Sequence, residues 1–350
     1  MAHVWSPLKV HAMLHLDMDK AKISVSHGAG GRMMQELIKE IASIIENKKT
    51  RDGRGIDVLE DAGIANINGT KIAFTTDSYT VDPIFFPGGS IGKLAVCGTI
   101  NDLAVMGAKP LALTLALVLE EGFPMAELKK IVMDINKEVK KANVAIISGD
   151  TKVMEKGKID KIIINTAGIG IVRYDVSDYY ARPGDKVMVS GSIGDHGMAL
   201  LARRFKFETK LKSDCSSIAS MALSLLKTGG IRVMKDPTRG GLAACLNEIA
   251  EKSKVDMVVY EDKVPIKEEV RSVGEVLGID PMHTACEGRC VIIAKEEKAE
   301  EILNMAKRFD RNASIIGDVV KGSGKVFIET KIGSKRYLES PIGELYPRIC

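Results

Sequence analysis

Four aspartates stand beside apolar segments, where a carboxylate needs a partner. Asp77 and Asp150 follow strand-like runs, Asp102 interrupts an otherwise apolar helical pattern, and Asp61 lies in the segment Leu59–Gly63. A carboxylate in such surroundings is costly unless it is paired or bound to a cation. Taken singly, each aspartate is more simply a cap or turn residue. Together the four favour a site where Mg²⁺ bridges protein carboxylates to substrate phosphates.

Two glycine-containing segments precede helical patterns and suit an anion. The first is His27–Gly31, with Gly30 inside it, and the second is Asp236–Gly241, which contains Arg239. Backbone N–H groups at the start of a helix bind phosphate, and an arginine clamps it. The alternatives are a tight turn without a ligand and a solvated surface arginine. Neither a Walker A loop nor the dinucleotide-binding fingerprint is present, so the common nucleotide folds are disfavoured.

The cysteines and histidines give weaker signals. All but one of the cysteines lie within the chain, whereas Cys350 is its last residue. The cluster His283, Cys286 and Cys290 lacks a nearby fourth ligand, so a zinc site is disfavoured. His196 is typical of loop or cap chemistry. The sequence leaves open whether a disulfide forms among Cys215, Cys245, Cys286 and Cys290.

The composition limits the class of protein. A chain of 350 residues is long enough for about two domains, and its 27% of charged and 45% of apolar residues exclude a disordered chain. The net charge of +4, with both signs interleaved, shows no nucleic-acid footprint. The longest apolar run, Leu111–Leu119, is far shorter than the about twenty residues that span a bilayer, and no signal peptide is present. We therefore expect a cytoplasmic protein with no membrane or nucleic-acid partner.

Alternating strand and helix patterns would position these residues. Helical patterns follow the first glycine loop and cover Ile91–Met106 and Pro124–Ala142. Turn residues at Arg182–Asp185 predict a domain boundary. Strand-like runs before it are Ile23–Val25, Lys71–Thr76, Leu111–Leu119, Val144–Ser148 and Lys161–Val172. The expected division is an N-terminal extension without a role (1–22), an N-terminal domain (23–180), a C-terminal α/β domain (181–330) and a tail (331–350).

Several segments carry a family resemblance when they are read together: His27–Gly31, Thr75–Ser78, Gly98–Gly107, Ser148–Val153, Asp236–Gly241, Ala285–Gly288 and Pro347–Cys350. They resemble the HypE family of hydrogenase maturation proteins, which are carbamoyl dehydratases. The resemblance extends from about Ile23 to Cys350, and the terminal Pro-Arg-Ile-Cys is its most specific part. The wider superfamily includes aminoimidazole ribonucleotide synthetase, thiamine-monophosphate kinase and selenophosphate synthetase.

The resemblance implies an α/β (α+β) fold of two domains, like that of aminoimidazole ribonucleotide synthetase. The N-terminal domain would bind ATP and pair with its copy in a homodimer, forming an intersubunit β-barrel, and the tail would be flexible. By family position the Mg²⁺ ligands are Asp61, Asp77, Asp102 and Asp150. Asp61 is the loosest match, because Glu60 precedes it where an aspartate is frequent. The implied ATP-binding residues are His27, Gly30, Gly31, Asp61, Asp77, Asn101, Asp102, Gly149, Asp150, Thr151, Lys152, Asp236 and Arg239.

The family's reaction implies roles for the remaining residues. A HypF-type carbamoyltransferase would load a carbamoyl group onto Cys350, ATP would phosphorylate its oxygen, and loss of phosphate would leave a thiocyanate. Glu287 is the expected base, and Lys152 would polarise the oxygen or the phosphate. The cyano group would pass to iron held by a HypC–HypD complex. The tail is expected to lie beside the phosphates in one state and to be exposed in another, with Arg348 or active-site cations activating the sulfur.

Two other functions remain open on the sequence. One is a different ATP-using member of the superfamily, a kinase or ligase that acts on a diffusible small molecule, for which Cys350 would be incidental. The other is a non-catalytic carrier that offers the thiol of Cys350 to partners or metal and does not hydrolyse ATP.

Overall fold

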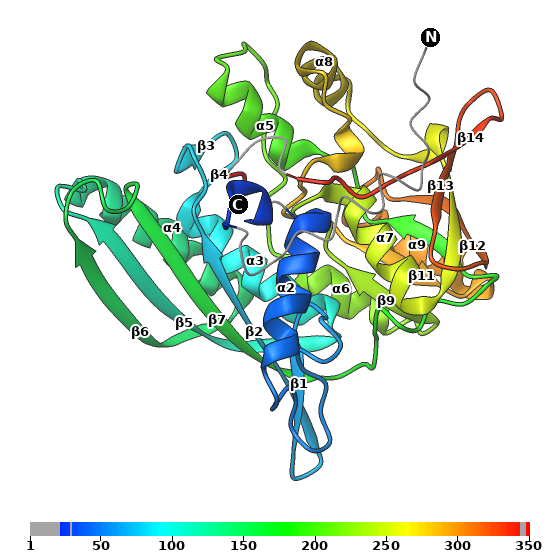
Figure 1. Ribbon diagram of the computed structural model, residues 1–350, viewed down its shortest axis with the longest axis horizontal. Helices are drawn as coiled ribbons and strands as arrows, with labels where there is room; N and C mark the ends of the chain where they lie inside the picture. Colours follow the sequence, from blue (N-terminus) through cyan, green and yellow to red (C-terminus); the bar gives the residue numbers. More distant parts are fainter. Residues whose placement is uncertain (1–21, 29, 344–347) are drawn as a thin grey trace.

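The structure is a computed structural model that describes residues 22–28, 30–343 and 348–350. The expected N-terminal extension therefore lies, apart from residue 22, outside the described residues, as does part of the expected tail. Two sheets lie side by side, each with helices packed on it (Figure 1). In the described part of the chain, no helix is both long enough and apolar enough to cross a bilayer.

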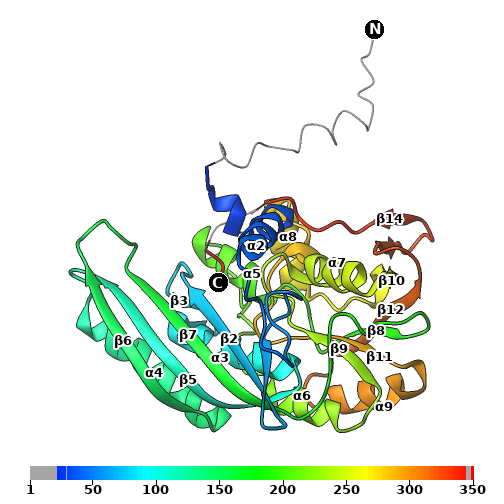
Figure 2. The same ribbon diagram turned by 60° about the horizontal axis from the view of Figure 1, so that its bottom comes forward.

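The first sheet has five strands and is open rather than closed into a barrel (Figure 2). All neighbouring strands are antiparallel except the last two, which are parallel. In spatial order the strands are β1 (Gly63–Ile67), β2 (Thr70–Tyr79), β7 (Ile162–Val172), β5 (Ala108–Glu120) and β6 (Ala145–Met154). Helices α3 (Ile91–Val105) and α4 (Met125–Ala142) pack on one face of this sheet, and a short hairpin, β3 (Phe85–Phe86) and β4 (Gly89–Ser90), precedes α3.

Helix α3 is buried on almost every side, which explains its apolar sequence. One side packs on β2 and β7, and Ala104 and Val105 near its end pack against helix α6 of the second half of the chain. A helix that is hydrophobic all round is a core element. Helix α3 is therefore the common support of both sheets, and its Asp102 is held at their junction.

Strand β6 is the uncovered edge of the first sheet. Every residue from Ala145 to Val153 is exposed, including Ile147 at 68% and Val153 at 64%. Only β5 pairs with it in the described chain. An edge strand with exposed apolar side chains is a template for pairing with another chain. The first sheet thus presents an unpartnered apolar edge.

The second sheet has seven strands with helices on both faces. Helix α7 packs on one face, and α6 and α9 pack on the other. Its strand order is β14 (Lys335–Tyr337), β13 (Val326–Glu329), β10 (Val255–Tyr260), β12 (Ser314–Lys321), β8 (Lys186–Val189), β11 (Val291–Ala294) and β9 (Ile231–Lys235). The helices are α5 (Asp195–Arg204), α6 (Ala219–Leu226), α7 (Gly241–Ser253), α8 (Glu268–Leu277) and α9 (Glu296–Ala306).

The elements differ from the expected ones mainly near the two ends of the chain. The expected strand Ile23–Val25 is absent, and η2 (Val25–Gly28) is instead a short 3₁₀ turn before helix α2 (Arg32–Ile44). Ile23 and Val25 are exposed, so neither has a sheet to join. The expected tail is partly ordered, because β14 pairs with β13 and the side chain of Leu338 is buried.

Candidate active site

A small cavity of about 40 Å³ lies where β2, α3 and the loops of the second sheet meet the end of the chain. Acidic, cationic and thiol side chains share its wall. They are the predicted site residues Asp77, Asp102, Asp236, Arg239, Glu287 and Cys350. Segments that are far apart in the sequence therefore converge on one place.

The aspartates of this cavity repel one another. Asp102 accepts a hydrogen bond of 2.8 Å from the Thr75 hydroxyl, and Asp77 accepts one of 3.2 Å from the Tyr79 hydroxyl. Burial, reinforced by the charges of Asp77 and Asp236, holds the pKa of Asp102 well above its usual range. Burial likewise raises the pKa of Asp236 to about 8. A divalent cation would relieve this repulsion.

Asp61 lies beside this group and is paired with a lysine. Its carboxylate forms an ion pair with the buried Lys235, which also lies 3.4 Å from Asp178. Burial raises the pKa of Asp61 to about 6, although Lys235 works against the rise. Its Oδ2 is buried and has no hydrogen-bond partner among the described residues. The Asp61 carbonyl accepts from the same Thr75 hydroxyl that binds Asp102, so both aspartates are positioned by one side chain.

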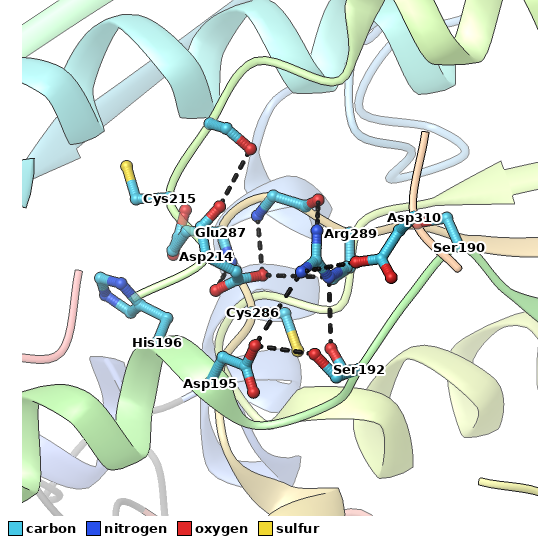
Figure 3. Close-up of polar contacts among 12 residues, drawn as sticks. Ser190, Ser192, Asp195, His196, Asp214, Cys215, Cys286, Glu287, Arg289 and Asp310 are labelled. Carbon is cyan, nitrogen blue, oxygen red and sulfur yellow. Dashed lines mark hydrogen bonds and ion pairs between the residues drawn. The ribbon is translucent and has the colours of Figure 1, made fainter. Parts of the chain in front are cut away.

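Glu287 is a buried carboxyl group held by its backbone. Its N–H donates to Asp214 at 3.2 Å, and its carbonyl accepts from the Ser216 N–H at 3.1 Å. Asp214 in turn faces Arg289 (Figure 3). The side-chain Oε1 is buried and, within the described chain, has no hydrogen-bond partner. Burial, with Asp236 next in effect, keeps the pKa of Glu287 well above its usual range.

Arg239 is the cation that faces Cys350. The negative charge at Cys350 is the main reason that the pKa of Arg239 is raised, with Asp77 and Glu287 adding to the effect. Arg348, the other cation considered for the sulfur, points elsewhere. Its Nε donates to the Thr80 carbonyl at 2.8 Å and its guanidinium pairs with Asp160. Of these two arginines, Arg239 is the one that lines the cavity together with Cys350.

The first glycine loop does not line the cavity in this conformation. His27 is half-buried and its Nδ1 contacts the Ser24 hydroxyl. Gly30, at φ +78°, packs so tightly on Arg239 that a Cβ there would lie 2.3 Å from the Arg239 Cβ. The N–H groups of Arg32 and Met33, at the start of α2, donate to the carbonyls of residues 341 and 342. These N–H groups at the start of α2, which we expected to bind phosphate, therefore bind residues 341 and 342 of the tail instead. Gly31 also packs against Pro341.

The predicted residues of β6 lie away from the cavity within one chain. Gly149, Asp150, Thr151 and Lys152 are all exposed, and within the described residues the Asp150 carboxylate accepts a hydrogen bond from the Thr151 N–H at 2.8 Å. Strands β7 and β5 separate β6 from β2, which carries Asp77. Three strand spacings of about 4.8 Å amount to about 14 Å. In the described chain no three acidic, histidine or cysteine side chains form a ready metal site.

Asn101 has a structural place that the sequence did not indicate. Its side-chain amide donates to the Ser216 and Glu287 carbonyls, and its oxygen accepts from the Ile218 N–H at 2.8 Å. It thus ties α3 to the loop that carries Glu287. The remaining lining residues are Ser78, Tyr79, Gly98 and Thr238, of which Tyr79 had no sequence signal. A Cβ at position 98 would meet the Tyr79 hydroxyl at 2.2 Å, which explains the glycine.

Comparison with known proteins shows the family of this chain. The family models "AIR synthase related protein, N-terminal domain" and "AIR synthase related protein, C-terminal domain" match residues 59–172 and 182–329. The carbamoyl dehydratase HypE of Rhizobium leguminosarum bv. viciae is 42% identical over 96% of this chain and 97% of its own.

Solved structures agree as well. A HypE–HypF complex contains a chain with a TM-score of 0.82 and 44% identity, covering 89% of this chain and 100% of that one. A HypE structure in complex with ATP has a TM-score of 0.79 and 40% identity, covering 93% of this chain and 98% of that one.

The fold and the site thus define a two-domain α/β protein of the AIR-synthase-related class. Within that class, the chain belongs to the HypE family of carbamoyl dehydratases.

The raised pKa values predict how stability depends on pH. Asp61 and Asp236 bind protons more tightly in the folded state than in the unfolded chain, so stability falls as pH rises from about 4 through their folded pKa values of about 6 and about 8. We expect the melting temperature without metal to fall between pH 5 and pH 8, and added Mg²⁺ to raise it more at pH 8. Asp236→Asn should flatten the profile, as measured by calorimetry. A wild-type profile that rises over this range would contradict the electrostatic account.

Proposed function

We propose that this chain is an ATP-dependent carbamoyl dehydratase of hydrogenase maturation, with Cys350 as the carrier of the carbamoyl group. The observation that carries the proposal is the position of Cys350, in the same small cavity as Asp77, Asp102 and Glu287. A carrier thiol beside metal-binding carboxylates and a buried glutamate suits a reaction that takes place on the thiol itself.

The reaction balances without a further reactant. The carbonyl oxygen of the S-carbamoyl group attacks the γ-phosphorus of ATP, and ADP leaves. The phosphorylated oxygen then departs as phosphate while nitrogen loses its two protons, one before and one during expulsion. The product is an S-cyano cysteine, and the oxygen of the carbamoyl group ends in phosphate. Phosphorylation serves to convert a poor leaving group into a good one.

Glu287 is the proposed acceptor of a proton from nitrogen. Its unpartnered Oε1 and its position in the cavity place a carboxyl group next to Cys350. As it stands, burial and the charge of Asp236 favour the protonated form. Positive charge near Asp236 would lower the pKa of Glu287 and let it act as a base. The same burial keeps water from the reactive intermediate.

The carboxylates fit a magnesium ion. Asp77 and Asp102, with Asp61 beside them, offer the hard oxygen ligands that Mg²⁺ prefers, and the Oδ2 of Asp61 is buried without a hydrogen-bond partner among the described residues. These residues would hold the metal, and Arg239 and the backbone of residues 236–241 would contact phosphate. When bound, Mg²⁺ neutralises the phosphates and stabilises the transferring phosphoryl group. Asn101 does not line the cavity and would act indirectly, by holding the Glu287 backbone in place through a hydrogen bond.

A homodimer would complete the site. The exposed β6 of one chain would pair with its copy, join the two open sheets into a barrel, and carry Gly149, Asp150, Thr151 and Lys152 toward the partner. Asp150 would then add a metal ligand, and Lys152 would polarise the oxygen or phosphate. His27, Gly30 and Gly31 would reach ATP only after the tail released the start of α2.

The partners and the location follow the same proposal. A HypF-type carbamoyltransferase loads Cys350, and a HypC–HypD complex accepts the cyano group, in the cytoplasm. Residues 23–180 bind ATP and dimerise, 181–330 form the flanking α/β domain, and 331–350 move to present Cys350. A related kinase for a small molecule is disfavoured, because the chain is 42% identical to a carbamoyl dehydratase over nearly its full length and Cys350 lines the proposed site.

Intact mass spectrometry tests the function directly. After incubation with HypF, carbamoyl phosphate and ATP, a carbamoyl adduct on Cys350 should lose the mass of one water when Mg²⁺-ATP is present. Cys350→Ser should show neither species while keeping nucleotide affinity, because oxygen is a weaker nucleophile than a thiolate. Cys245→Ala, which changes a buried cysteine of α7, serves as the control. An adduct on any cysteine other than Cys350 would overturn the proposal.

Glu287→Gln should load normally and bind ATP but form thiocyanate about a hundredfold more slowly, because the amide cannot accept the proton. Rapid-quench mass spectrometry of the loaded chain measures this rate. Glu251→Gln, at an exposed position of α7, should match the wild type. A normal rate in the Glu287 variant would remove this residue from the mechanism.

Ile147→Glu should convert a dimer into monomers, because it places charges face to face on the edge of β6. We expect the variant to keep its melting temperature and lose at least about tenfold of its dehydration rate, since each tenfold loss of rate is about 1.4 kcal/mol of barrier. Analytical ultracentrifugation gives the assembly state. Val276→Glu, at a position of α8 that is 73% exposed, is the control. A monomeric wild type with full activity would exclude the shared site.

A further inference from the structure

His196 is a buried imidazole for which the reaction has no use. It lies on α5, shows no exposed surface, and presents its ring edge to Phe86 with a centroid distance of 5.4 Å. Its Nε2 is 2.8 Å from the Ile349 carbonyl oxygen, one residue before the carrier cysteine. Its Nδ1 is 2.7 Å from the Ser213 hydroxyl.

The partners of the ring define its tautomer. A carbonyl oxygen only accepts, so Nε2 carries the hydrogen that is donated to Ile349. In a neutral ring Nδ1 then accepts from the Ser213 hydroxyl, whose oxygen accepts from the Cys215 N–H at 2.9 Å. Burial lowers the pKa of His196 to about 4 and Arg204 also opposes its protonation, so the ring is neutral in ordinary buffers. The donor that faces the tail is thus fixed.

A second side chain of α5 holds the preceding peptide. Arg204 donates to the Arg348 carbonyl and also to the Asp82 carbonyl at 2.6 Å. The Asp82 N–H donates to the same Arg348 carbonyl at 3.1 Å. Arg348 has φ +60°, a left-handed conformation that is unfavourable for an arginine and persists only where contacts hold it. The side chain of Ile349 packs against the core residues of α5 and of the first sheet. The contacts of His196 and Arg204 with the Ile349 and Arg348 carbonyls, together with the packing of Ile349, form a binding site for the end of the chain, which we call the seat.

The seat shares a loop with the proposed base. Ser213 contacts His196, the carboxylate of Asp214 accepts from the Glu287 N–H, and the Ser216 N–H donates to the Glu287 carbonyl. Figure 3 shows His196, Asp214 and Glu287 around this loop. The segment 213–216 consequently fixes both the tail peptide and the backbone of Glu287. A movement of the tail would therefore change the distance between the group carried on Cys350 and the Glu287 carboxyl group.

We propose that His196 is a positioning residue for the dehydration, which holds the Ile349 carbonyl through Nε2 and so seats Cys350 beside Glu287. Arg204 is the second contact of this seat. Segment 213–216 contacts both His196 and the Glu287 backbone, and so fixes the position of Cys350 relative to Glu287. The inference rests on the proposed role of Cys350 as the carrier. The bonds to the tail are made to main-chain carbonyls, so they form equally well with a free, carbamoylated or cyanated cysteine.

Two substitutions of His196 distinguish loss of its hydrogen bond to the Ile349 carbonyl from a general loss of folding stability. The amide nitrogen of His196→Gln lies close to the place of Nε2 and can still donate to Ile349, whereas that of His196→Asn lies near Nδ1 and cannot reach. The first readout is the rate at which iodoacetamide alkylates Cys350 in the full chain without HypF or ATP, followed by peptide mass spectrometry. The other cysteines are buried. His196→Asn should raise the rate about fivefold, the effect of one lost hydrogen bond, and His196→Gln should restore it.

The second readout is single-turnover thiocyanate formation from a chain preloaded by HypF. His196→Asn should lower this rate about fivefold at saturating ATP and leave the KM for ATP unchanged. His283→Asn is the matched control, since its Nε2 contacts another tail carbonyl, that of Glu339 at 3.1 Å, outside the seat. Ser213→Ala, which frees the tautomer but keeps the ring, should raise alkylation about twofold and tests the seat if His196→Asn does not fold.

The outcomes are distinct. Equal alkylation rates in the wild type and His196→Asn would overturn the seat, even where Cys350 proves to be the carrier. Faster alkylation of Cys350 together with all buried cysteines, in both His196 variants alike, would make the residue merely structural and also overturn it. Faster alkylation in His196→Asn alone supports the seat. Absence of any carbamoyl adduct in the wild type would instead overturn the proposed function, while leaving the alkylation result to be judged by itself.

Discussion

Negative charge is crowded at the junction of the two sheets, and the chain supplies too few cations of its own to balance it. Asp77, Asp102, Asp236 and Glu287 share one small cavity. Lys235 lies with Asp61 and Asp178 at the margin, and Arg239 faces Cys350. The folded chain tolerates this arrangement by holding protons, as the raised pKa values of the buried carboxyl groups express. A cation bound at this site would relieve the repulsion among the carboxylates, and this relief would contribute to the free energy of binding the cation and its phosphates.

Much of the cavity could be anticipated, because its residues sit in short motifs. The pairing of Asp77 with Asp102, and of Arg239 with Glu287 and Cys350, followed from family resemblance rather than from spacing alone. The helix Ile91–Val105 could be predicted from the residues themselves, since a largely apolar pattern of that length is typical of a buried helix. Its burial on almost every side also accounts for why Asp102, in its last turn, needs the Thr75 hydroxyl.

Other features had no local signal. The contact of Gly30 with Arg239, and the bonds from the start of α2 to residues 341 and 342, join segments from opposite ends of the sequence through the main chain. A main-chain hydrogen bond does not depend on the type of side chain, so the sequence could not show whether the N–H groups at the start of α2 bind phosphate or the tail. His196 was indistinguishable from a cap residue, because its partner is a carbonyl group that every residue possesses.

The exposed edge at β6 links solubility to assembly. Its free N–H and C=O groups and its apolar side chains can pair with any extended chain as readily as with a second copy. In the proposed homodimer, correct pairing would be a second-order process, so its rate relative to unwanted pairing would depend on the concentration of matching protomers. Dilution would then remove more than activity. It would leave an open hydrogen-bonding edge in solution, so the protein's concentration would become part of what keeps it soluble.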